Sequence, residues 1–148
     1  MTIAVDFDGT IVEHRYPDIG EEKPFAVQTL RMLIADHHRL ILWSVREGKL
    51  LDDAVNWCRQ RGLEFYAVNR DYPEETVGGN EHYSRKLKAD IFIDDRNIGG
   101  LPDWGTIYSM ITHGTQWYQF HSETATDNKD YNTRSFWRPW WKRLLNIN

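Results

Sequence analysis

The sequence has little of what marks secreted, membrane-spanning and nucleic-acid-binding proteins. Its 148 residues include one cysteine, Cys58, which excludes an internal disulfide framework and is typical of a reducing compartment. No apolar run approaches the ~18 residues of a membrane span. The N-terminus also lacks a basic region followed by an apolar stretch and a cleavage site. We therefore expect a cytoplasmic protein.

Basic charge is also scarce over most of the chain, whose formal net charge is −4. Residues 1–113 contain 13 Lys and Arg against 19 Asp and Glu, whereas residues 114–148 contain 5 against 3. An acidic body lacks the electrostatic footprint of a nucleic-acid-binding surface, so we expect no nucleic-acid partner. The length suits one hydrophobic core. We expect that core over residues 1–113 and a separate tail over residues 114–148.

What the chain does have is a regular alternation of apolar runs and amphipathic segments. Residues 2–7, 40–43, 64–68 and 89–93 are predicted strands, and residues 69–85 a loop. Helices are predicted from Pro24 to about residue 36, over 47–61 with Gly62 as the stop, and over 104–111, alone or with a short strand. Strands alternating with helices predict a mainly parallel, Rossmann-like sheet in a three-layer α/β/α sandwich.

Polar side chains follow several of these predicted strands at the point where each one ends. Asp6 and Asp8 end the first, Ser44 follows the second, and Asp94 and Asp95 follow the last, with lysines just before it. The carboxyl ends of parallel strands meet at one edge of a sheet, where open α/β folds bind ligands. Several carboxylates in one crevice repel each other unless a cation holds them, and oxygen ligands suit Mg²⁺.

These residues resemble the motifs of the haloacid dehalogenase-like (HAD) superfamily of phosphohydrolases. Its first motif is an apolar strand ending Asp-x-Asp-x-Thr, which matches residues 6–10. The second is a strand ending in Ser or Thr, here Ser44, and the third is a lysine. The fourth is an acidic pair after an apolar strand, here Asp94 and Asp95. All four occur in order over residues 1–111.

The resemblance implies a Mg²⁺-dependent phosphomonoester hydrolase. Asp6 would attack phosphorus and form an aspartyl-phosphate. Asp8 would protonate the leaving oxygen and then activate the hydrolytic water. The metal would be held by Asp6, the backbone carbonyl of Asp8, and Asp94 or Asp95. The implied partner is a phosphorylated substrate, either a small molecule or a macromolecule.

The same resemblance gives candidates for binding the phosphoryl group. Ser44 and the motif lysine would contact its oxygens. Aligning the last strand with the pattern of related small hydrolases makes Lys86 that lysine, with Lys88 as second choice. Thr10 belongs to the same set, although we expect it chiefly to order the loop by hydrogen bonding. Arg46 follows Ser44 closely enough to contact a second phosphate or carboxylate.

The spacing of the motifs also predicts that a large cap domain is missing. Thirteen residues separate Thr10 from Pro24, too few for a folded cap. The segment between Ser44 and Lys86 is largely used by the predicted core, which leaves at most a loop lid over residues 69–85. An open site of this kind suits a large substrate or closure by a neighbouring subunit in a homo-oligomer.

The tail raises a separate question. Residues 135–145 are aromatic and basic without an acidic residue, and Pro139 limits any helix there to about two turns. We favour packing on the chain's own body or across a homo-oligomer. The alternative is that the segment lies on an anionic membrane surface.

Two further functional classes stay open. A phosphotransferase would use the same aspartyl-phosphate and pass the phosphoryl group to a hydroxyl other than water. A catalytically silent HAD-like scaffold would act through its tail, although the intact Asp6 and Asp8 weigh against it. Response-regulator receivers place their acidic pair after the first strand, so the order found here disfavours them.

Overall fold

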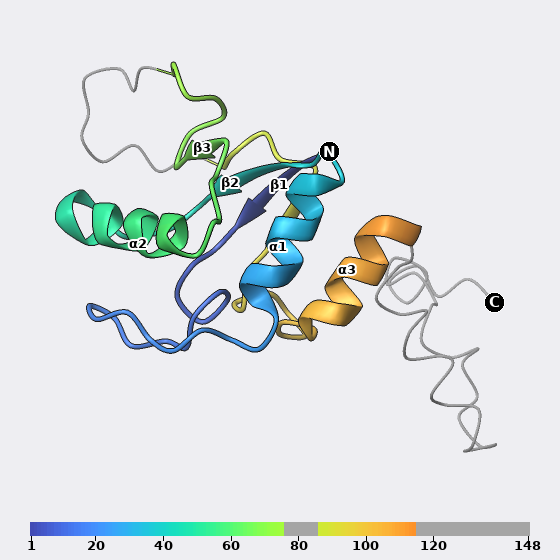
Figure 1. The fold of residues 1–148 in the computed structure, drawn as a ribbon, viewed down its shortest axis with the longest axis horizontal. Helices are drawn as coiled ribbons and strands as arrows, with labels where there is room; N and C mark the ends of the chain where they lie inside the picture. Colours follow the sequence, from blue (N-terminus) through green and yellow to red (C-terminus); the bar gives the residue numbers. More distant parts are fainter. Residues whose placement is uncertain (76–85, 115–148) are drawn as a thin grey trace, which may run out of the picture. The chain divides into compact units, whose positions relative to one another are not determined.

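The computed structural model describes residues 1–75 and 86–114. The chain divides into two units, Met1–His113 and Gly114–Asn148, and the second, with the basic aromatic segment 135–145, lies outside the described residues apart from Gly114. The elements follow one another along the first unit as in Figure 1. They are β1 (Thr2–Val5), α1 (Ala26–Ala35), β2 (Arg39–Leu42), α2 (Gly48–Gln60), β3 (Ala67–Val68), β4 (Ile91–Ile93) and α3 (Trp104–His113).

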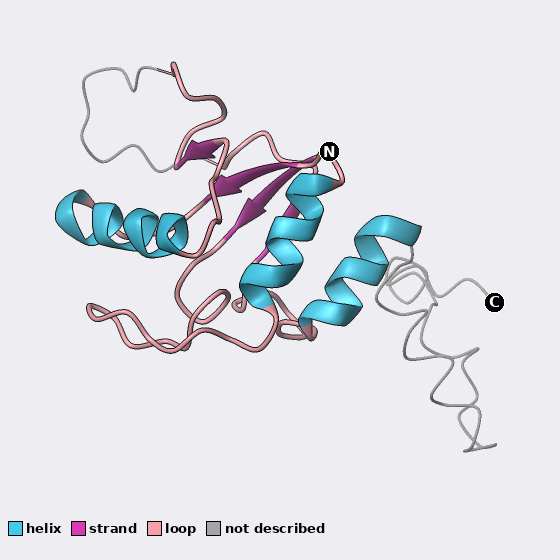
Figure 2. Ribbon diagram, in the orientation of Figure 1, coloured by secondary structure: helices cyan, strands magenta, loops and turns pink. Residues whose placement is uncertain are grey.

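The four strands form one sheet in the order β3-β2-β1-β4, and every pair is parallel. Figure 2 shows the strands in magenta, with the arrowheads of β1, β2 and β3 pointing the same way. Val5 at the end of β1 lies opposite both Leu42 of β2 and Ile93 of β4. The predicted α/β class with a parallel sheet is therefore confirmed, and three polar strand ends meet at one edge.

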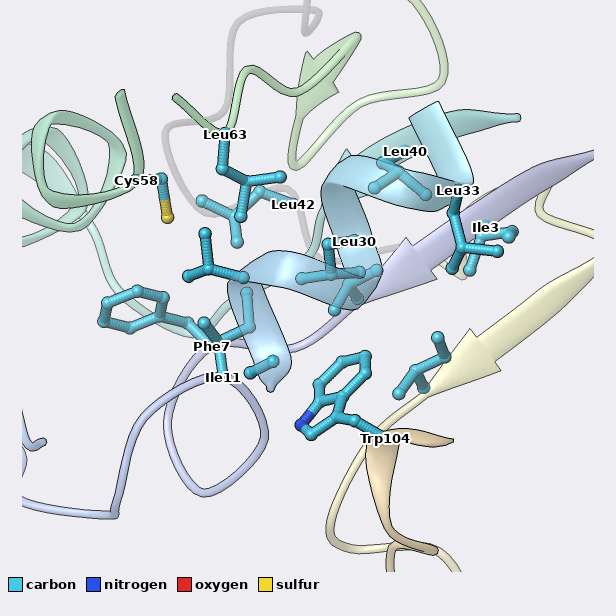
Figure 3. Packing of buried hydrophobic residues seen from close by; sticks show 14 of the residues in the cluster. Ile3, Phe7, Ile11, Leu30, Leu33, Leu40, Leu42, Cys58, Leu63 and Trp104 are labelled. Carbon is cyan, nitrogen blue, oxygen red and sulfur yellow. The ribbon is translucent and has the colours of Figure 1, made fainter. Parts of the chain in front are cut away.

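The helices lie on one face of this sheet. Ile3 and Val5 of β1 belong to a core cluster that includes Leu30 of α1, Cys58 of α2 and Trp104 of α3. Figure 3 shows this packing from close by. The alternate strand positions face the other way and form a smaller cluster. Its members are Ala4, Ile41, Ala67 and Leu87, with Trp43, Ala89 and Phe92 packed against them.

The described residues show a sheet with helices on one face, and the third layer of the expected three-layer sandwich stays a prediction. No helix within the described ranges covers the second face, which is packed instead by Leu87 and Ala89 from the connection before β4. Strand order explains why. The chain moves from β1 to β2 to β3 in one direction and then returns past β1 to β4, and a right-handed crossover in this reversed direction agrees with the place of Leu87 and Ala89 on the opposite face.

Several element ends differ from the sequence-based prediction. β3 has two residues, which pair with Ile41 and Leu42 of β2, and β4 has three, which pair with Ile3, Ala4 and Val5 of β1. α1 begins two residues after Pro24, since Phe25 adopts a left-handed conformation. Gly62 ends α2 as expected, with a positive φ of 70°. Residues 104–113 form one helix, and none of the three described helices is long and apolar enough to cross a bilayer.

Candidate functional site

The polar strand ends lie at the point where the order of the sheet reverses. β1 is followed in sequence by β2 on one side, and it is flanked on the other side by β4, which the chain reaches last. Ligands bind open α/β sheets in the crevice at the carboxyl ends of such strands. Asp6 comes directly after β1, and Asp94 and Asp95 come directly after β4. The backbone N–H of Asp6 still donates to the carbonyl of Ile93, at 2.9 Å, which keeps the two strand ends together.

Three carboxylates converge at this edge of the sheet. Asp6, Asp94 and Asp95 can each offer one oxygen such that all three atoms lie within 4.8 Å of one another. Thr10 joins two of them, because its hydroxyl donates to Asp6 Oδ2 at 3.0 Å and accepts the backbone N–H of Asp95 at 3.0 Å. The expectation that Thr10 orders this loop by hydrogen bonding is confirmed. The fold therefore brings together residues that lie nearly ninety positions apart in the sequence.

The electrostatics of this cluster are unfavourable for the protein alone. Burial raises the pKa of Asp6 from 3.8 to about 7, and the charges of Asp94 and Asp95 push it in the same direction, while hydrogen bonds from Phe7 and Thr10 lower it. The buried Oδ1 atom of Asp95 has no hydrogen-bond partner. A buried anionic oxygen without a partner costs free energy that a bound cation would offset. The donor set, all carboxylate oxygen, fits a hard divalent ion such as Mg²⁺.

Gly9 is required by the same geometry. Its φ is 92°, in the left-handed region, and a Cβ atom built there would overlap the carboxylate of Asp95. Glycine alone among the residues has neither the strain nor the overlap. The first loop can therefore approach the β4 end closely enough for Thr10 to reach Asp95.

Asp8 faces a different partner. Both of its carboxylate oxygens accept hydrogen bonds from Arg46, from Nε at 2.6 Å and from Nη2 at 2.7 Å. The pairing with Asp8 raises the pKa of the guanidinium further above its ordinary value. Arg46, expected to contact substrate, instead has a relative exposure of 0% and pairs with Asp8. The pair could not be predicted, because the sequence places a cation near Ser44 without showing which carboxylate it contacts.

Ser44 follows β2 at the same edge of the sheet, two residues after Leu42. Asn69 pins its backbone on both sides, because the side chain of Asn69 accepts the Ser44 N–H at 2.8 Å and donates to the Ser44 carbonyl at 2.9 Å. The Ser44 hydroxyl accepts the backbone N–H of Arg46 at 3.2 Å. Asn69 was not among the predicted site residues. Its available signal was an asparagine directly after a predicted strand, a residue that tolerates its observed φ of 52°.

The lysines before β4 are not drawn into the carboxylate cluster. Lys86 is exposed, and its Nζ lies 5.4 Å from the centre of the Phe92 ring. The backbone N–H of Lys88 donates to Asp71 Oδ1 at 2.8 Å. Within the described residues neither lysine forms an ion pair with Asp6, Asp94 or Asp95. The choice of Lys86 over Lys88 as the phosphate-binding lysine stays a prediction.

Fold and site together define an α/β protein with a carboxylate cluster at the switch point of a parallel sheet. No protein-family model matches the chain, and no curated protein matches it. Among solved structures, the chain is similar to the conserved protein coded by a locus of Bacteroides thetaiotaomicron. The two share 68% sequence identity with a TM-score of 0.76 over 82% of this chain and 97% of that one. The chain belongs to the same family as this conserved Bacteroides protein.

Proposed function

We propose that the chain is a Mg²⁺-dependent phosphomonoester hydrolase of the HAD-like type, acting through an aspartyl-phosphate on Asp6. The observation that carries the proposal is the convergence of Asp6, Asp94 and Asp95 within 4.8 Å at the switch point. A purely structural role does not explain why the pKa of Asp6 is raised by burial and neighbouring carboxylates, or why a buried Asp95 oxygen has no hydrogen-bond partner. Perturbed carboxylates in a crevice are typical of functional sites.

Asp6, Asp94 and Asp95 would hold the ion together with the backbone carbonyl of Asp8. When bound, Mg²⁺ would neutralise negative charge between the attacking carboxylate and the phosphoryl group. A positive charge within a few ångströms favours the ionised form of a carboxyl group. Asp6, with a pKa of about 7 in the protein alone, is thereby kept as the anion that a nucleophile must be.

The other catalytic roles are assigned to side chains of the protein itself. Asp6 forms the bond to phosphorus as the bond to the leaving oxygen breaks. Asp8, two residues further on, handles the protons of the leaving oxygen and of the hydrolytic water. The Ser44 hydroxyl accepts a hydrogen bond from Arg46, so its own proton is left to donate to a phosphoryl oxygen. Lys86 supplies a cationic partner for the same oxygens.

The proposal includes the finer architecture of the HAD-like fold. The connection before β4 would complete the third layer of the sandwich, on the face that carries Leu87. Residues 11–25 contain an isolated bridge between Val12 and Glu22 and no helix or strand, which supports the lack of a large cap in that position. We further propose a cytoplasmic protein with a phosphorylated substrate, a small molecule or a macromolecule reaching an open site.

The test is hydrolysis of 4-nitrophenyl phosphate and of a panel of phosphorylated metabolites, with Mg²⁺ and with EDTA. Wild-type turnover should require the metal, and Asp6→Asn should lower kcat by at least about a thousandfold. The matched control is Asp90→Asn, because Asp90 is an exposed carboxylate that accepts the Thr2 N–H and should leave turnover unchanged. Turnover that persists in Asp6→Asn or in EDTA would refute the proposal.

The same assay separates hydrolase from phosphotransferase. Adding an alcohol at high concentration leaves a hydrolase releasing inorganic phosphate in proportion to the nitrophenol. A phosphotransferase would instead release less phosphate than nitrophenol, since part of the phosphoryl group goes to the alcohol. We expect equal yields.

A further inference from the structure

Arg46 is the largest fully buried side chain of the molecule's described part, and its guanidinium is almost saturated with acceptors. Besides the two bonds to Asp8, Nη1 donates to the carbonyl of Pro17 at 2.9 Å and Nη2 donates to the carbonyl of Asp18 at 2.8 Å. Four of the five N–H donors of an arginine are thus used. One side chain therefore joins Asp8 to the segment 14–18.

Two aromatic rings lie close to this guanidinium. The Arg46 carbon Cζ lies 5.3 Å from the centre of the Phe7 ring and 5.3 Å from the centre of the Tyr16 ring. Phe7 is buried in the core and follows Asp6 in the sequence, and Tyr16 belongs to segment 14–18. A planar cation with fixed donors suits this environment, whereas a lysine would lose the fork of hydrogen bonds.

The backbone of Arg46 also contacts Ser44, the residue proposed to bind the phosphoryl group. Its N–H donates to the Ser44 hydroxyl at 3.2 Å. This bond comes from the backbone and does not depend on the side chain at position 46, whereas the guanidinium itself fixes the Asp8 carboxylate. A buried ion pair is by itself weak evidence for stability, and one that also binds the carbonyls of Pro17 and Asp18 has a better explanation in the placement of Asp8 and of that segment.

We propose that Arg46 is a positioning residue for the phosphoryl-transfer site: it fixes the carboxylate of Asp8, the proposed proton-transfer group, and ties segment 14–18 to it through the Pro17 and Asp18 carbonyls. The inference rests on the proposed function. Arg46 itself has no exposed surface with which to touch substrate, so its effect is exerted through Asp8 and through the segment. A side chain that acts in this way contributes to turnover and little to substrate affinity.

The experiment is a double-mutant cycle on 4-nitrophenyl phosphate with Mg²⁺, using Asp8→Asn, Arg46→Met and the two combined. Each single substitution should lower kcat by about a hundredfold or more, with KM changed by less than about threefold. The double variant should be no slower than the slower single variant, because Arg46 acts through Asp8. Losses that simply multiply would overturn the proposal, since a merely structural arginine adds its own damage.

Two variants keep the test independent of folding. The double variant of the cycle carries no buried charge at this pair. A further variant, Arg46→Lys, keeps the cation without the fork and should recover a small part of kcat. The matched control is Arg39→Met, since Arg39 also stacks on a tyrosine, 5.3 Å from the Tyr66 ring, but lies at the start of β2. It should turn over substrate at the wild-type rate.

Hydrogen exchange of the peptide covering residues 13–19 provides a readout that needs no activity. Exchange should be at least about tenfold faster in Arg46→Met than in wild type, because the bonds to the Pro17 and Asp18 carbonyls are lost. It should be unchanged in Arg39→Met. Wild-type protein without Mg²⁺-dependent turnover would overturn the proposed function and the catalytic half of this inference. Unchanged exchange in Arg46→Met would overturn the tie to segment 14–18.

Discussion

Replacing Asp6 by asparagine should stabilise the metal-free protein, by an amount that grows with pH. The pKa of the Asp6 carboxyl is raised from 3.8 to about 7 by burial and by Asp94 and Asp95. A carboxyl group with a higher pKa in the folded state binds its proton more tightly there. Its contribution to stability is complete below the unfolded pKa and is lost as pH rises through 7. Asparagine does not titrate, and its amide oxygen can still accept the Thr10 hydroxyl.

The size of the effect follows from the two pKa values. Above pH 8 the ionised Asp6 costs the folded state about 4 kcal/mol, from about three pKa units at 1.36 kcal/mol each. At pH 5 the folded protein keeps the proton while the unfolded chain has largely lost it, so the cost is about 1.5 kcal/mol. The difference in free energy of unfolding between Asp6→Asn and wild type should therefore widen by about 3 kcal/mol between pH 5 and pH 9.

Urea unfolding in EDTA at several pH values measures this difference directly. The matched control is Asp53→Asn, because Asp53 is an exposed carboxylate paired with Lys49 at 2.9 Å, and its effect should stay below about 0.5 kcal/mol. Adding Mg²⁺ at pH 9 should stabilise wild type and leave Asp6→Asn nearly unchanged, which closes the gap. A gap that is constant from pH 5 to pH 9 would refute the argument that burial and neighbouring charge raise the pKa of Asp6.

Two other substitutions test the hydrogen bonding and the close approach around Asp95. Thr10→Val should lower the free energy of unfolding by about 2 kcal/mol, because it leaves the Asp95 N–H and an Asp6 oxygen unpaired; Thr10→Ser, which keeps the hydroxyl, should recover most of this in urea unfolding. Gly9→Ala should abolish Mg²⁺ binding in calorimetric titration, since its Cβ would displace the Asp95 carboxylate. The control is Gly48→Ala, because Gly48 also has a positive φ, of 51°, but has open space around it. This variant should lose about 1 kcal/mol of stability to backbone strain and bind Mg²⁺ normally.

Much of the fold can be predicted from the sequence because strand and helix periodicity are local. The apolar run before Asp6 is a buried strand and the run before Asp94 a partly buried one, and Gly62 ends α2 where its conformational freedom predicts. The lengths of β3 and β4 could not be read in this way. They depend on how far each strand stays paired with its neighbour in the folded sheet, and β3 is paired with Ile41 and Leu42 of β2.

Some residues of the candidate site could likewise be predicted from the sequence and others could not. The cluster of Asp6, Asp94 and Asp95 could be expected because the carboxyl ends of parallel strands meet at one edge. The role of Arg46 could not, since the sequence shows a cation near a motif residue but not the side of the carboxylate on which it lies. Asn69 escaped notice for a similar reason, because its two bonds to Ser44 require the exact separation of β2 and β3.

The contrast between Asp6 and Asp8 explains why one strand end carries two carboxylates. Both follow β1, but the charge of Asp8 is balanced within the protein by the buried guanidinium of Arg46. Asp6 faces Asp94 and Asp95, and its neighbours within the described residues supply hydrogen bonds but no positive charge. The protein alone must therefore leave Asp6 half protonated near neutral pH or repelled by its neighbours. Because the charge of Asp8 is balanced and that of Asp6 is not, the site is suited to bind a cation at Asp6. This is also where the proposed nucleophile needs a cation.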